Sequence, residues 1–493
     1  MNRGLLYLLA NFAYLAIIAV GAASTDGVHV VYLCSLFALC STPLLVARPL
    51  NGPFSVLSLL LLIFFVFYGL QDSIGAWTGR PSSGDTGEMF TATEMAILLG
   101  AVLAIGGYLI ALAVMKPNLN AAPPKNWSPG VVVTMGLILW AVGSYSAWVW
   151  NVQLITDTTI ATKMRALSGV SGIKTTLLMM GQMAKPLGML MIAYAYVMYE
   201  RAWLRPTLLA VVFFQLLYGF VVDVKGEAML GIVLVVVTKV LLDGRLPKVW
   251  LGVGVLFVVL AFPVFQAHRV TNGSRGIDHA ATARDIGKSI ERALESRDKV
   301  SQGRNRAQNF FERASLKGSV DLIVERTGES VAYREGYTLT PLLAAFIPKL
   351  VWADKPDVQA GQVMNQDFHV SISRDTYISP SHLGELYWNF GWTGILLGMP
   401  LIGVMLGTVG ARANLADRIT LTRLLVMVVT IRTIVMGFEG TIAVSYVVWL
   451  RSLAGIGILH LLLARVQSAS AALQRHSQDE VDGLGQTRTV SVP

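Results

Sequence analysis

The sequence predicts an all-α membrane protein that crosses the bilayer about twelve times. Hydrophobic residues make up 54% of the 493 residues and charged residues only 14%, whereas soluble proteins carry roughly 25% charged residues. The apolar residues also fall into runs of about twenty, which is the length that a helix needs to cross the hydrocarbon core. One long polar segment, residues 267–390, interrupts these runs.

The expected spans divide the chain into four parts. They cover residues 5–23, 28–47, 54–71, 91–115, 129–150, 176–199, 206–222, 227–243, 248–266, 391–411, 421–438 and 441–464. Region 1–266 therefore holds about nine helices, 267–390 forms a large loop, and 391–464 holds about three helices. The tail, 465–493, is polar and low in aromatic residues, so we expect it to be disordered.

The basic residues indicate the orientation. The even-numbered connections carry basic side chains such as Arg48, Lys116, Arg205 and Arg412, and such connections stay in the cytoplasm. Both termini are then cytoplasmic, and the long loop lies on the outer side. This bias also accounts for most of the net charge of +9, so we expect anionic membrane lipids rather than nucleic acid as partners.

Two outer segments carry basic charge against this rule, which indicates a function. The shorter, residues 151–175, contains Arg165, and the long loop contains Arg269, Arg275 and Arg374. Within the long loop, the charge spacing predicts a helix over 281–329. Residues 340–351 are apolar but too short to span, so they are expected to be re-entrant or interfacial.

Ionisable residues in or beside the spans are candidates for a functional site, because charge is costly in a bilayer. Lys185 and Arg432 lie within spans, and Lys225 and Glu227 lie where two spans meet on the outer side. The alternative is ion pairing between helices, for example Lys185 with Glu227 or Arg432 with Glu439.

The most informative segment is Ser379-Pro-Ser-His382-Leu-Gly-Glu385-Leu-Tyr387-Trp-Asn389-Phe-Gly391, at the outer start of the tenth span. His382 and Glu385 are three apart and share one face of a helix. Either could act as a general base toward a sugar hydroxyl. The alternative is an interfacial belt of polar groups that are already hydrogen-bonded. No Asp-x-Asp motif or histidine cluster suggests a metal, so we expect no metal and no other cofactor.

This segment, preceded by Phe346-Ile-Pro-Lys349 and Trp352-Ala-Asp-Lys-Pro356, resembles the Wzy-type polymerases of O-antigen and exopolysaccharide repeat units. The layout of about a dozen spans with a large outer loop near the C-terminal end is also similar. Two features depart from that family. Val224-Lys225-Gly226 stands where many relatives have Ser-Arg-Gly, and only Arg292 to Gly303 matches the paired Arg-x10-Gly motifs.

The resemblance implies a GT-C-like membrane glycosyltransferase of the bacterial inner membrane, with its large loop in the periplasm. Its substrates would be undecaprenyl-pyrophosphate-linked oligosaccharides, and a chain-length regulator would be a further partner. The implied catalytic residues are His382, Glu385 and Glu227. The implied substrate-binding residues, which would meet the pyrophosphate and the sugars, are Lys225, Arg269, Arg275, Arg374, Arg432, Lys185, Arg165 and Tyr387.

Two other functions compete with this one. A ligase that moves a finished glycan to a lipid A core shares the large loop and its arginines. A transporter or flippase would need polar groups distributed through the spans, whereas here they gather at one side.

Overall fold

The structure, a computed structural model, describes most of the helical bundle and part of the polar segment. The described residues are 3–21, 27–45, 55–77, 91–115, 127–149, 172–199, 201–222, 225–243, 247–254, 315–344, 359–371, 376–413 and 420–486, with residues 256, 257, 287, 288, 291, 347 and 352 between them.

Within these residues the chain is helical, with a single isolated bridge between Thr327 and Val331 and no strand. The first half consists of α1 (Arg3–Gly21), α2 (Gly27–Cys40), η2 (Thr42–Leu44), α3 (Val56–Tyr68), α4 (Leu70–Trp77), α5 (Ala92–Val114), α6 (Pro129–Trp148), α8 (Gly172–Met198), α9 (Leu204–Val221) and α10 (Lys225–Asp243). The second consists of α15 (Lys317–Arg326), η5 (Tyr337–Leu339), α16 (Thr340–Ala344), α17 (Ala360–Phe368), α18 (Ser381–Ala413), α19 (Leu421–Thr430), η6 (Ile431–Val435), η7 (Met436–Glu439) and α20 (Ile442–Gln486).

The prediction of a helical membrane protein is confirmed. In the described part of the chain, six helices are long and apolar enough to cross a membrane, and the bent pair α3–α4 raises the number to seven. Three shorter apolar helices lie in α1, α2 and α8. The predicted total of twelve and the GT-C-like arrangement stay predictions, and most of the expected span 248–266 lies outside the described residues.

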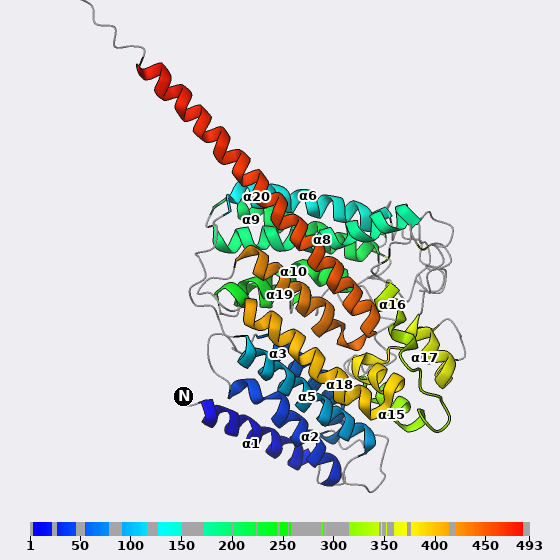
Figure 1. The fold of residues 1–493 in the computed structure, drawn as a ribbon. Helices are drawn as coiled ribbons and strands as arrows, with labels where there is room; N and C mark the ends of the chain where they lie inside the picture. The colour runs from blue at the N-terminus through cyan, green and yellow to red at the C-terminus, as the bar shows by residue number, and fades with distance from the viewer. Residues whose placement is uncertain are drawn as a thin grey trace, which may run out of the picture.

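The long helices run side by side, and the polar elements α15, α16 and α17 gather at one end of the bundle (Figure 1). Helix α18 begins among them, whereas α1 begins at the opposite end and α20 leaves the bundle there (Figure 1). The end with α15–α17 is called the loop end below.

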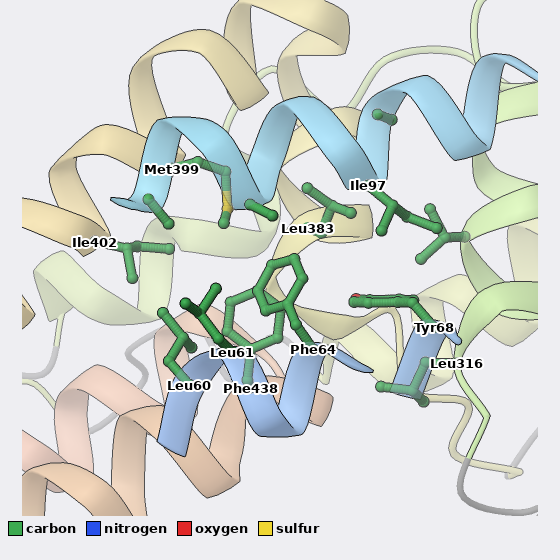
Figure 2. Packing of buried hydrophobic residues seen from close by; sticks show 14 of the residues in the cluster. Leu60, Leu61, Phe64, Tyr68, Ile97, Leu316, Leu383, Met399, Ile402 and Phe438 are labelled. Atoms are coloured by element: carbon green, nitrogen blue, oxygen red, sulfur yellow. The ribbon is translucent and has the colours of Figure 1, made fainter. Parts of the chain in front are cut away.

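Two buried apolar clusters hold the bundle together. The first joins α2, α3 and α5 to α18 and η7, and includes Phe64, Ile97, Leu383, Met399 and Phe438 (Figure 2). The second lies among α6, α8, α9 and α10. Helices α19 and α20 contribute to both clusters, so they join the two halves of the bundle.

Helices α5 and α18 approach each other closely because glycines face the contact. A Cβ atom on Gly107 would lie 2.1 Å from the carbonyl oxygen of Pro400, and one on Gly403 would lie 2.1 Å from that of Ala104. Small residues at such contacts let membrane helices pack backbone to backbone. This contact fixes the position of α18, and therefore of the motif at its start.

Several boundaries differ from the sequence predictions, and the differences in α18, α20 and α15 are the most informative. Helix α18 begins at Ser381, and a non-helical turn at Gly391 (φ 59°, ψ −144°) separates a short first helix from the predicted span. Helix α20 continues to Gln486, where the composition predicts disorder, because helix-forming Ala, Leu, Gln and Arg continue the span. In the described part of 281–329, helix α15 ends at Arg326, three residues early.

Candidate functional site

Two groups of polar side chains lie among the membrane helices. The first group, here called the cation cluster, consists of Lys185 on α8, Gln215 and Tyr218 on α9, Glu227 on α10 and Arg432 on η6. The second is the motif at the start of α18, which packs against the start of α20.

Lys185 and Glu227 form an ion pair between α8 and α10. Gln215 supports it by donating from Nε2 to the Glu227 side chain at 3.0 Å and to its backbone carbonyl at 2.7 Å. The Lys185 ammonium lies over the Tyr218 ring, 4.2 Å from its centre. Lys185 is 2% exposed, so in this structure its charge is balanced by Glu227, as the ion-pairing alternative predicts.

Arg432 is the exposed cation of the cluster. It interacts electrostatically with Glu227 and Lys185, but it forms no hydrogen bond or ion pair with any residue that the structure describes, Glu439 included. It lies on the π-helical turn η6, where the regular hydrogen bonding of α19 ends. Such π-helical turns are frequent at functional sites. Arg432 is therefore the member of the cluster that is free to bind an anion.

His382 lies at the start of α18 and is fully buried. Its Nε2 lies 3.2 Å from the Ser445 hydroxyl on α20. Its ring lies between Phe438 and Tyr446, with ring centres 4.8 and 5.8 Å away. In this structure the imidazole joins α18 to η7 and α20.

Glu385, one turn further along, is also fully buried. Its Oε2 accepts the backbone N–H of Ile442 at 2.6 Å, and Ile442 is the first residue of α20. The first N–H groups of a helix have no partner within it, and a carboxylate there also favours the helix dipole. Glu385 thus caps α20 from a different helix.

Asn389 and Tyr387 of the motif are also buried. Asn389 donates to Thr338 and to the Glu385 carbonyl, both at 2.7 Å, and its Oδ1 accepts the N–H of Gly336. Tyr387 packs into the first apolar cluster and lies edge-on to Trp392. The structure therefore brings the motif together as a junction between helices, and base catalysis by His382 or Glu385 stays a prediction.

A third group of charges joins the polar segment to the membrane helices. Lys317, the first residue of α15, donates to Asp72 of α4 at 3.0 Å and to Glu94 of α5 at 2.9 Å. Its ammonium lies 4.9 Å from the centre of the Tyr32 ring. All three charged side chains are largely buried. One cation therefore forms ion pairs with two buried carboxylates.

The electrostatics of this group stabilise the charge on Lys317. Burial opposes that charge, but Asp72 and Glu94 attract it and accept its hydrogen bonds, so the pKa of Lys317 is raised above its usual value of 10.5. Burial raises the pKa of Asp321, one turn further along α15, and the attraction of Lys317 offsets this only in part.

Four of the predicted substrate-binding residues, Arg165, Arg269, Arg275 and Arg374, lie outside the described residues. Lys225 is placed by its backbone, as the first residue of α10.

Two ion-pair groups in the structure are not predicted from the sequence. One is Lys317 with Asp72 and Glu94, which the position of Glu94 inside a predicted span could have indicated, because charge is costly there. The other is Arg334 with Asp367, which form a two-point ion pair within the polar segment. The sequence does not single out this pair, because the loop contains many arginines.

Residues 144–448 match a family described as a domain of unknown function, DUF8712. The match covers more than half of the chain. The protein belongs to the DUF8712 family. No curated protein and no solved structure matches it. The DUF8712 match includes the cation cluster, Lys317 and the α18 motif, whereas Asp72 and Glu94 lie before it.

Proposed function

We propose that this protein is a membrane glycosyltransferase that polymerises oligosaccharide repeat units carried on undecaprenyl pyrophosphate. In this proposal the loop end faces the periplasm of a bacterial cell, and both termini lie in the cytoplasm. The donor would be the growing glycan, and the acceptor a single lipid-linked repeat unit.

The observation that carries the proposal is Arg432, an exposed cation without a hydrogen-bonding partner among the described residues, on a π-helical turn within a span. Arg432 lies within a candidate membrane span, where an unpaired charge is costly, so a bound anion would stabilise it. In this proposal the anion is the pyrophosphate of the lipid carrier, whose negative charge grows as the glycosyl bond breaks. A guanidinium can bind two phosphate oxygens at once.

The neighbouring pair Lys185–Glu227 supports this role for Arg432. The ion pair leaves the Lys185 ammonium and the Glu227 carboxylate balanced, so Arg432 contributes the excess positive charge of the cluster. In glycosyl transfer, this charge would stabilise the leaving pyrophosphate. The acceptor hydroxyl would still need a base, for which His382, Glu385 and Glu227 are the candidates.

The experiment is to measure the length of the surface glycan by gel in cells that lack the gene and express variants. We expect Arg432→Ala to abolish the ladder of long chains and leave a single repeat unit, and Arg432→Lys to restore part of it, because lysine keeps the charge but not the two-point contact. Arg423→Ala is the matched control, since Arg423 lies near the opposite end of α19. All variants are checked for equal amounts in the membrane.

The glycan products of the variants and of the deletion strain distinguish a polymerase from a ligase and a flippase. A normal ladder with Arg432→Ala would overturn the role of Arg432. Long chains that accumulate on undecaprenyl pyrophosphate in the deletion strain would overturn polymerisation in favour of the ligase. Repeat units trapped on the cytoplasmic face would overturn glycosyl transfer in favour of the flippase.

A further inference from the structure

Exposed aromatic residues gather at the loop end, where α18 enters its membrane-spanning part. Tyr333 and Tyr337 come from the polar segment, and Phe390 and Trp392 flank the break in α18 at Gly391. We call these four residues the aromatic patch.

The patch is continuous, although its residues come from two parts of the chain. The Tyr333 ring lies against Gly391, and the Phe390 ring against Gly336, with distances of 3.1 Å to the position of an added Cβ in both cases. Tyr337 directly follows Gly336. Tyr333 and Phe390 therefore lie beside the break in α18, and Tyr337 and Trp392 are their near neighbours in the chain.

Backbone hydrogen bonds attach the segment that carries Tyr333 and Tyr337 to the start of α18. The N–H groups of Arg334 and Glu335 donate to the carbonyls of Trp388 and Asn389 at 3.0 and 3.1 Å. These carbonyls end the first helix of α18 and would otherwise lack partners. The polar segment thus caps this helix end, and its aromatic residues have a fixed position relative to the span.

The patch also continues the lipid-facing side of α18. Further along α18, Leu396, Leu397 and Leu401 are exposed, and Leu401 is 68% exposed. On the side of the polar segment, Leu343 of α16 is 76% exposed and Tyr337 48%. Large apolar surfaces of this kind mark contact with a membrane or a partner.

We propose that the aromatic patch, with Leu343, rests in the interfacial layer of the lipid bilayer and holds the polar segment against the membrane surface. Tyrosine and tryptophan favour this layer, because their rings are apolar and their tips can bond to water and head groups. The Arg334 guanidinium, which pairs with Asp367, lies 5.9 Å from the centre of the Tyr337 ring and 5.8 Å from that of Trp388, so it packs behind the patch. The proposal does not depend on the chemistry that the protein performs.

The test uses the full chain in phosphatidylcholine nanodiscs, with both native cysteines changed to alanine and a fluorophore attached to one new cysteine. The labelled variants are Tyr337→Cys and Leu343→Cys. Leu401→Cys is the lipid-exposed reference, and Ser330→Cys, an exposed polar position, is the water-exposed reference. Quenching is measured with lipids brominated near the head group and, separately, with iodide in solution. Size-exclusion chromatography confirms that each variant is folded.

We expect brominated lipid to quench the labels at 337 and 343 to within about two-fold of the label at 401, while iodide quenches them several-fold less than the label at 330. Iodide quenching equal to that at 330, without quenching by lipid, would overturn the proposal. Protection from both quenchers would also overturn it, and would indicate a second copy of the chain on this surface.

Discussion

Lys317 of the polar segment donates to Glu94 of membrane helix α5 at 2.9 Å, and to Asp72 of α4 at 3.0 Å. The three side chains are largely buried. This contact joins α15 to two membrane helices, so the polar segment is attached to the bundle by a charge that the sequence analysis does not identify.

Lys317→Met should destabilise the protein, because two buried carboxylates lose their cation. Removing one partner of a buried ion pair costs about 3–5 kcal/mol, so we expect a clear fall in the thermal midpoint in detergent. Lys239→Met is the control, since Lys239 forms a more exposed pair with Asp243 and should change stability by under about 1 kcal/mol. Equal effects of the two changes would contradict the structural role of Lys317.

The raised pKa of Lys317 predicts how the difference in thermal midpoint between wild type and Lys317→Met depends on pH. A lysine whose folded pKa lies above its unfolded value contributes its full stability below the unfolded value, 10.5, and loses it as the pH rises through the folded one. The difference in thermal midpoint between wild type and Lys317→Met should therefore stay constant from about pH 7 to pH 9. A difference that shrinks steadily over this range would show that Lys317 titrates there.

Changing Lys185 and Glu227 together separates an ion pair from a catalytic base. Lys185→Met alone should be strongly destabilising, because the partly buried Glu227 carboxylate loses its ion pair and keeps Gln215 as its hydrogen-bonding partner among the described residues. The double variant Lys185→Met/Glu227→Gln should recover most of the lost stability, since no unpaired charge remains. Glycan ladders then decide whether the pair is purely structural: a normal ladder removes Lys185 and Glu227 from the functional residues, and a folded double variant without a ladder supports a role for the pair in the reaction.

Glu385→Gln should leave stability nearly unchanged, because the amide oxygen can still accept the N–H of Ile442. Glu385→Ala should cost about 1–3 kcal/mol, because that buried N–H loses its partner. The measurements are thermal unfolding in detergent and glycan length in cells. If Glu385→Gln is as stable as wild type and makes no polymer, Glu385 has a chemical role beyond capping α20, whereas a normal ladder assigns it to structure alone.

Gly391→Ala should destabilise the start of α18. The backbone there has a positive φ of 59°, which side chains rarely tolerate, and an added Cβ would also meet the Tyr333 ring. We expect a loss of about 1–3 kcal/mol in thermal unfolding. Gly455→Ala in α20 is the control, because an added Cβ there meets open space, and alanine favours a helix. A neutral Gly391→Ala would show that the break in α18 does not require glycine.

The sequence by itself determines the class of the protein and most of its helices. A span depends on the length of an apolar run, which is a local property, so the predicted ranges agree closely with α5, α6, α9 and the continuous run of α19, η6 and η7. The cost of charge in a bilayer also lets the sequence single out Lys185 and Glu227, and even suggests their pairing, which the structure confirms.

Only the tertiary structure decides which polar groups have partners. Lys317 meets acidic residues 245 and 223 positions away, and Glu385 caps a helix that begins 57 residues later. The spacing of His382 and Glu385 predicts that they share one face of a helix, and both are buried because α20 and η7 pack over them. Spacing along a helix shows which side chains share a face, whereas the packing of distant helices decides whether that face meets water, lipid or another helix.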